Sequence, residues 1–152
     1  MRSIGITVVV AIGSATLLAQ SAPVKMGLWE KTVVTSNGEG SPSTMKAKSC
    51  ITPNAWQQMV ANESKPHEGC TMNTVKNANG YTFNGTCNIA HGSSLVISGS
   101  SAIEDSEHIV SQSHSTTTMN GKTRKMDVQS TSRFLGSSCG SIKPDAPEIE
   151  NQ

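Results

Sequence analysis

Hydrophobic and polar residues alternate along most of the chain after residue 22, and turn residues break this pattern at short intervals. An alternation with a period of two places successive side chains on opposite faces of a β-strand. It is clearest where Tyr81, Phe83 and Cys87 share one face and polar residues such as Thr82 occupy the other. The pattern therefore predicts a mainly β domain with half-buried strands.

We expect about seven antiparallel strands in a meander that forms a strongly bent sheet or an open barrel. Clusters of glycine, asparagine and serine, such as Asn79-Gly80 and His91-Gly92-Ser93, separate the strands. The predicted strands cover residues 26–35, 43–50, 70–77, 81–90, 95–103, 107–119 and 122–135.

The Asn120-Gly121 pair is the strongest local turn signal in the chain. Both residues adopt positive φ readily, and a type I′ turn needs positive φ at its two central positions. A two-residue hairpin here pairs Met119 with Lys122 and places His114 opposite Asp127. One face of the hairpin is then polar and charged, while the other carries a few apolar residues among the serines at 111, 113, 115, 130 and 132.

One short helix is predicted over residues 53–62. The Thr52-Pro53 pair supplies an N-cap hydroxyl and a residue suited to the first helical turn. Trp56, Met59 and Val60 follow at the i, i+3 and i+4 spacing of a single helix face. Because so short a helix is marginal on its own, we expect this face to dock on the sheet.

The chain divides into three parts. Residues 1–22 combine a basic start, an apolar run and small residues at the end, which is typical of a helical secretory signal peptide. The apolar run is shorter than the roughly 20 residues that span a bilayer, so we expect an exported mature protein without a membrane span. Residues 23–144 form a single β domain, and the acidic, proline-containing residues 145–152 form a flexible tail.

The composition limits how large a core the domain can bury. The chain is 35% hydrophobic and only 3% aromatic, and the apolar leader takes part of that share. Its 12 basic and 11 acidic residues give a net charge of +1. This balance, together with the few aromatic residues available for base stacking, argues against a nucleic-acid-binding protein. A domain with so little apolar material needs covalent support.

Four cysteines lie in the predicted domain: Cys50, Cys70, Cys87 and Cys139. An even number in an exported chain favours two disulfides, and no spacing matches the Cys-x-x-Cys of a zinc ribbon or a redox site. Three pairings are open. We favour Cys50–Cys70, which would close a loop around the helix, and Cys87–Cys139, which would tie the chain end to the sheet.

Several short motifs occur together in the domain. They are Gly27-Leu28-Trp29-Glu30, Cys50-Ile51-Thr52-Pro53, Arg133-Phe134-Leu135-Gly136 and Cys139-Gly140-Ser141-Ile142-Lys143-Pro144. With Cys70 and Cys87 between them, these motifs resemble the DUF3617 family over nearly the whole mature chain. The resemblance implies a small bacterial protein of unknown function, exported to the periplasm or beyond, with a disulfide-bonded β fold. It implies no catalytic residue.

The histidines do not predict a metal site. The chain has His67, His91, His108 and His114, and a structural metal needs several ligands that converge within a few ångströms. Even His108 and His114, which share a strand face, lie about 20 Å apart at the usual strand rise. We expect neither a metal nor a cofactor.

A hydrolase that uses His114 and Asp127 is a minor alternative. The predicted register places these two side chains together, where Asp127 could orient an imidazole base. Ser113 and Ser115, however, point to the opposite face of any regular strand. A surface pair between neighbouring strands is the simpler interpretation.

The favoured hypothesis is a non-enzymatic module that binds a small apolar ligand or a lipid on its bent sheet. Its candidate ligand-binding residues are the aromatic side chains Trp29, Trp56, Tyr81, Phe83 and Phe134. The alternative is an envelope protein-interaction module without a pocket, which pairs through an exposed strand edge.

Overall fold

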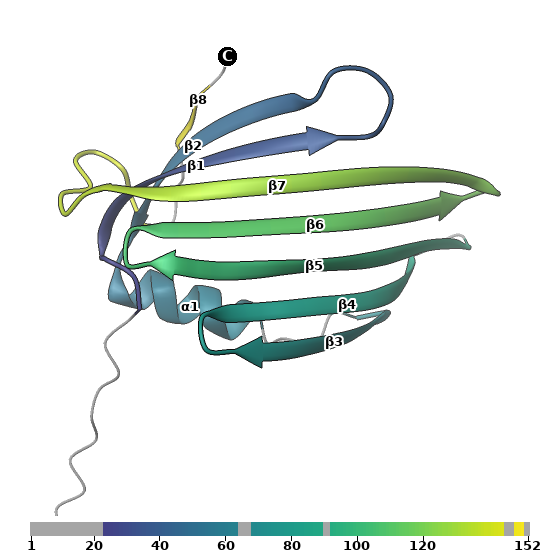
Figure 1. Cartoon of the computed structure of the whole chain (residues 1–152), viewed down its shortest axis with the longest axis horizontal. Coiled ribbons are helices and arrows are strands. Elements are labelled where there is room, and N and C mark those ends of the chain that lie inside the picture. The colour runs from purple at the N-terminus through teal and green to yellow at the C-terminus, as the bar shows by residue number, and fades with distance from the viewer. Residues whose placement is uncertain (1–22, 64–67, 90–91, 145–147, 151–152) are drawn as a thin grey trace, which may run out of the picture.

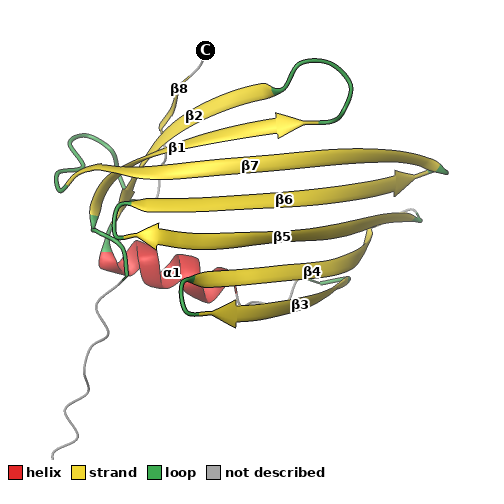
Figure 2. Cartoon of the chain, in the orientation of Figure 1, coloured by secondary structure: helices red, strands yellow, loops and turns green. Residues whose placement is uncertain are grey.

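The computed structural model describes residues 23–63, 68–89, 92–144 and 148–150 and shows one β-sheet with a single helix (Figures 1 and 2). The mainly β fold predicted from the alternation is confirmed. The elements in chain order are β1 Gly27–Ser36, β2 Ser43–Ile51, α1 Pro53–Glu63, β3 Cys70–Asn77, β4 Gly80–Ile89, β5 Ser93–Asp105, β6 His108–Met119, β7 Lys122–Gly136 and β8 Glu148–Glu150.

The eight strands form one antiparallel sheet in the order β3-β4-β5-β6-β7-β1-β2-β8. Strands β3 to β7 form a meander of five strands instead of the expected seven, and the β1–β2 hairpin joins it because β1 pairs with β7. The sheet is open, with β3 and β8 at its two edges. Since β2 and β3 lie on opposite sides of the sheet, the chain must cross one sheet face between them, and α1 lies in this connection (Figure 1).

The β6–β7 hairpin has the register predicted from its turn. Asn120 has a φ of 50° and Gly121 a φ of 74°, as a type I′ turn requires. Met119 pairs with Lys122, and His114 lies opposite Asp127. The small side chains of this hairpin therefore share one sheet face, which we call the inner face because α1 lies on that side.

Helix α1 begins where the sequence predicts. The Thr52 hydroxyl accepts a hydrogen bond from the Ala55 N–H at 3.2 Å, and the Thr52 carbonyl accepts one from the Trp56 N–H at 2.9 Å. The N-cap thus satisfies the first turn, as capping residues do. Figure 2 shows α1 beside the end of the sheet where β5 ends and β6 begins.

The packed core lies at that same end of the sheet. Its buried centre is formed by Val24, Trp29 and Ile51, and Trp29 is only 1% exposed. The indole N–H of Trp29 donates a hydrogen bond to the carbonyl of Lys25 at 2.9 Å, so the buried ring is also satisfied as a polar group. The partly buried apolar residues packed around this centre are Met26, Trp56, Ile103, Ile109 and Phe134.

Both disulfides differ from the favoured pairing. The structure joins Cys50 to Cys139 and Cys70 to Cys87, with Cα–Cα distances of 5.4 and 3.9 Å, instead of Cys50–Cys70 and Cys87–Cys139. The sheet order is the reason. Cys70 and Cys87 lie directly opposite each other on β3 and β4, whereas Cys50 lies on β2 at the other side of the sheet, beyond the reach of Cys70.

The chain end also differs from the expectation of a flexible tail over residues 145–152. Residues Glu148–Glu150 form β8, which pairs with Lys46, Ala47 and Lys48 of β2. An exposed strand edge offers unpaired backbone groups, and β8 satisfies part of that edge. The predicted signal peptide, residues 1–22, lies outside the described residues.

The two disulfides should stabilise the fold to different extents. Replacing Cys50 and Cys139 with alanine should lower the free energy of unfolding by about 4–5 kcal/mol, and replacing Cys70 and Cys87 by about 3 kcal/mol, because a bridge that closes a longer loop restricts the unfolded chain more. The sequence separations are 89 and 17 residues. Urea unfolding of both double variants measures the difference. A larger loss for the Cys70–Cys87 variant would contradict this ranking.

Candidate functional site

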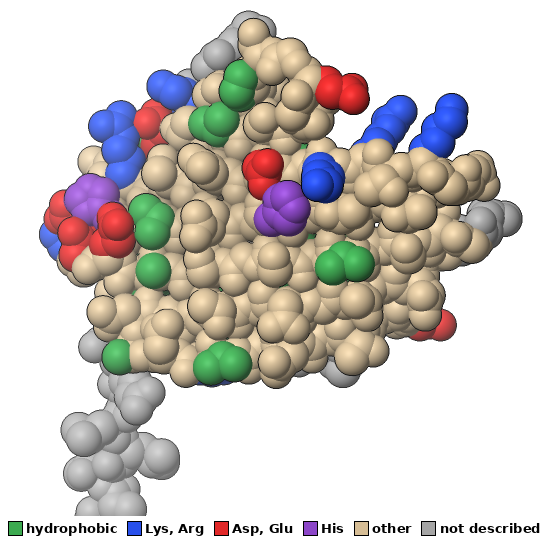
Figure 3. Space-filling model, turned by 45° about the vertical axis from the view of Figure 1, so that its right-hand side comes forward, with side chains coloured by type: hydrophobic (Ala, Val, Ile, Leu, Met, Phe, Trp, Pro, Cys, Tyr) green, Lys and Arg blue, Asp and Glu red, His purple; other side chains and the backbone are tan. Residues whose placement is uncertain are grey.

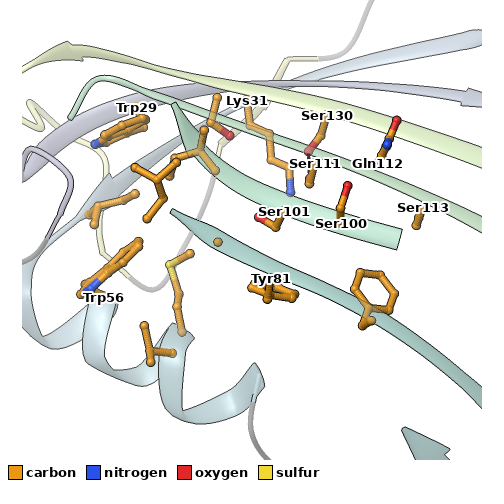
Figure 4. Close-up of a pocket in the computed structure, with 18 of the residues that line it drawn as sticks. Trp29, Lys31, Trp56, Tyr81, Ser100, Ser101, Ser111, Gln112, Ser113 and Ser130 are labelled. Carbon is orange, nitrogen blue, oxygen red and sulfur yellow. Dashed lines mark hydrogen bonds between the residues drawn. The ribbon is translucent and has the colours of Figure 1, made fainter. Parts of the chain in front are cut away.

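A cavity of about 510 Å³ lies between α1 and the inner face of the sheet (Figure 4). This volume is in the range that holds small organic ligands. Side chains from the helix and from strands β1 to β7 line the cavity. Its apolar lining residues are Trp29, Ile51, Trp56, Met59, Val60, Tyr81, Phe83, Ile103, Ile109 and Val128, and its polar lining includes Lys31, Lys76 and serines 49, 101, 111, 113, 130 and 132.

On five strands, the large apolar side chain that packs in or on the core is followed by a serine or a lysine at the next inner-facing position, two residues along the strand. Apolar residues such as Val33 and Val128 resume further along the same face. Two residues span roughly 6.6 Å along a strand, so the change is abrupt. The five steps are Ile103 to Ser101 on β5, Ile109 to Ser111 on β6, Phe134 to Ser132 on β7, Trp29 to Lys31 on β1 and Ile51 to Ser49 on β2.

Helix α1 presents an apolar face to the cavity, and the sheet covers only part of that face. Trp56, Met59 and Val60 all line the cavity, as the helical spacing predicts for one face. Trp56 packs against the core, but Met59 is 45% and Val60 41% exposed. Docking of the helix on the sheet is therefore confirmed at Trp56 and incomplete one turn later, where the cavity opens.

Serine side chains of the sheet line the cavity on the side opposite Met59 and Val60 of α1. The hydroxyls of Ser111 and Ser130 lie 2.6 Å apart and hydrogen-bond to each other across β6 and β7. Ser130 is 8% exposed, so this part of the sheet is shielded even though its side chains are small. Satisfied hydroxyls of this kind can sit in an interior without an unpaired polar atom.

Four of the five predicted ligand-binding aromatics line the cavity: Trp29, Trp56, Tyr81 and Phe83. Tyr81 and Phe83 lie together on β4, with ring centroids 6.1 Å apart. Phe134 is not among the described lining residues. It packs edge-on against Trp29 at 5.9 Å, with the ammonium of Lys25 5.5 Å from its ring centroid. Ligand binding by the four aromatics stays a prediction.

Sequence reasoning missed Lys31, the charged group beside the serines. Lys31 is exposed, and its neighbours in register are Ala47 on β2 and Ser132 on β7. Figure 4 shows its side chain extending over the serine-rich part of the cavity. The available signal was the alternation on β1, which places Lys31 on the same face as the buried Trp29.

The outer face of the sheet carries His114 and Asp127, the pair on which the hydrolase alternative was based. His114 Nδ1 lies 2.5 Å from Asp127 Oδ1, and both side chains are more than half exposed. Ser98 lies opposite His114 in register, but no hydrogen bond joins them in the described part of the chain. Ser113 and Ser115 alternate with His114 and belong to the inner face. Figure 3 shows histidines against acidic side chains on a surface with few hydrophobic groups.

No group of three His, Cys, Asp or Glu side chains suitable for a metal ion occurs within residues 23–63, 68–89, 92–144 and 148–150. His67 and His91 lie outside these ranges. Within the same ranges, no helix is long and apolar enough to cross a membrane.

One protein-family model matches the part of the chain that contains the whole buried core. Residues 24–139, from the buried Val24 to the disulfide-bonded Cys139, match the model of a family described as protein of unknown function DUF3617. The chain belongs to the DUF3617 family. No curated protein and no solved structure matches the chain significantly. The resemblance found in the motifs is thus confirmed, and the function of this DUF3617 protein has to be argued from its own residues.

A second outer-face pair gives this DUF3617 protein a pH-dependent contact. His108 Nδ1 lies 2.9 Å from both carboxylate oxygens of Asp105. This hydrogen bond raises the pKa of His108 above 6.5 and lowers the pKa of Asp105 below 3.8. Between the folded pKa of Asp105 and the folded pKa of His108, the carboxylate is negatively charged and the imidazole is positively charged, so both partners of the pair carry their charge. Its contribution is lost as the pH rises through the folded pKa of His108 or falls through that of Asp105.

The substitution Asp105→Asn should lower the pKa of His108 towards 6.5, because it removes the charged hydrogen-bond partner. Titration of the His108 ring protons by NMR measures the change. Asp127→Asn, on the neighbouring outer surface, is the matched control and should leave the His108 midpoint in place. Equal His108 midpoints in the wild type and in Asp105→Asn would show that this pair does not form in solution.

Proposed function

We propose that this protein is an exported, non-enzymatic module that binds a small apolar ligand or a lipid between α1 and the inner face of its sheet. The observation that carries the proposal is the cavity of about 510 Å³ whose walls include four aromatic side chains. Ligand sites are commonly concave and mainly apolar, with a few polar groups that fix orientation.

The incomplete docking of α1 supports this proposal. Apolar surface left in contact with water costs about 25 cal/mol for each Å². Met59 and Val60, on the helix face that lines the cavity, leave part of their apolar surface exposed to water. A ligand that fills the space would cover these side chains and the facing aromatic rings at the same time, so its binding has a direct hydrophobic driving force.

Two further features support export. The four cysteines are all paired in disulfides, which is consistent with an oxidising compartment. Residues 1–22 have the composition of a signal peptide. The alternative envelope module was expected to have no pocket, and the cavity therefore favours ligand binding over that alternative.

The tryptophans allow a direct binding test without labels. The chain contains two tryptophans, and both line the cavity. Adding the uncharged dye N-phenyl-1-naphthylamine should quench tryptophan emission and raise dye emission by energy transfer. The substitution Ser101→Phe, which places a ring in the cavity, should weaken binding by about tenfold or more, because the ligand and the ring compete for one volume.

Ser98→Phe is the matched control for this test. Ser98 lies on the same strand, β5, but its register partner is His114 on the outer face. This control should bind the dye like the wild type, and circular dichroism of both variants checks the fold. Equal dye affinities of Ser101→Phe and Ser98→Phe, or no saturable binding by the wild type, would contradict ligand binding in this cavity.

A further inference from the structure

The charged groups of the cavity are all of one sign. Among the residues that the structure describes, its lining contains Lys31 and Lys76 and no aspartate or glutamate. Lys31 belongs to the serine-rich part, and Lys76 lies on the edge strand β3 opposite Tyr81. The cavity is therefore electrostatically matched to a ligand that carries a negative charge.

The ammonium group of Lys31 has no acidic partner in the described part of the chain. Ion pairs found there include Lys25–Glu107, His108–Asp105, His114–Asp127 and Arg133–Glu30. None of them lies on the serine-rich inner face. A carboxylate bound in the cavity would thus gain the full charge-assisted hydrogen bond of Lys31 without displacing an internal ion pair.

The cavity also separates an apolar part from a polar part. The apolar part lies beside the core under α1 and is lined by Trp56, Met59 and Val60 of the helix and by the rings of Tyr81 and Phe83 on β4. Further along the strands from the core, Lys31 and the serine hydroxyls face the same space (Figure 4). A ligand that fits both parts has an apolar chain and a polar head at one end.

The donor set favours a carboxylate head over a phosphate. Phosphate sites commonly offer arginine forks or the N–H groups of a helix N-terminus. The described lining contains no arginine; its serine-rich part offers the ammonium of Lys31 beside uncharged hydroxyls such as Ser101 and Ser132, and Lys76 lies apart on the edge strand β3. One ammonium surrounded by neutral donors, as at Lys31, matches a head group that carries one negative charge.

We propose that the cavity binds a fatty-acid-like anion, with its alkyl chain between the sheet and the Met59 and Val60 side chains of α1 and its carboxylate at Lys31. This inference rests on the proposed function and adds the chemical class of the ligand. Lys31 acts as the residue that selects the anion, while the apolar part supplies affinity for the chain.

Dodecanoate and dodecan-1-ol test the inference, because they share one alkyl chain and differ in charge. Tryptophan emission is titrated with each compound below its critical micelle concentration. The wild type should bind dodecanoate more tightly. Lys31→Met should weaken dodecanoate binding by about tenfold, as expected for a lost charge-assisted hydrogen bond, and leave dodecan-1-ol binding within about twofold.

Two control variants complete the experiment. Lys125→Met removes the same charge from the exposed outer face of β7 and should change neither affinity. Lys31→Arg keeps the positive charge and should retain the preference for dodecanoate. Unchanged dodecan-1-ol binding by Lys31→Met excludes a general loss of folding as the cause of its weaker dodecanoate binding.

The outcomes separate the two proposals. If Lys31→Met keeps the wild-type preference for dodecanoate over dodecan-1-ol, the assignment of the anion to Lys31 is wrong, while ligand binding in the cavity stands. If the wild type binds both compounds equally, the inference of an anionic ligand is wrong. If the wild type binds neither compound, nor the uncharged dye, the proposed function itself fails.

Discussion

The change from large to small side chains across the inner sheet face determines how this domain packs. Protein interiors are close-packed and leave few spaces larger than a water molecule. Here Trp29 and Ile51 fill the sheet end under the first turn of α1, and serines replace such residues one step further along. The second turn of α1 therefore packs incompletely on the sheet, and its apolar residues Met59 and Val60 face a cavity.

Disulfides compensate for the small core that this arrangement leaves. The Cys50–Cys139 bridge joins β2 to the segment after β7, beside the buried cluster. The Cys70–Cys87 bridge holds the edge hairpin, which lies far across the sheet from β1 and its buried tryptophan. With both sides of the sheet fixed covalently, the inner face can keep small polar residues that contribute little hydrophobic stabilisation.

Local patterns in the sequence predicted strands β1 to β7, the helix and the register of the β6–β7 hairpin, because each depends on residues close together in the chain, whereas β8 was expected to be a flexible tail. The Asn120-Gly121 turn alone set the pairing of His114 with Asp127. The disulfide pairing was wrong because it depends on the non-local sheet order, which places β2 and β3 on opposite sides. Lys31 was missed for a related reason: its partners come from separate strands that only the assembled sheet brings together.

The central claim is that α1 and the sheet enclose a space for a ligand with an alkyl chain. A crystal structure of the protein grown with ω-bromododecanoate tests it most directly, because the anomalous signal of bromine locates the chain end. We expect a bromine peak between the sheet and the Met59 and Val60 side chains of α1. A structure without that peak, in which α1 is closed on the sheet and the Met59 side chain fills the cavity, would contradict the account.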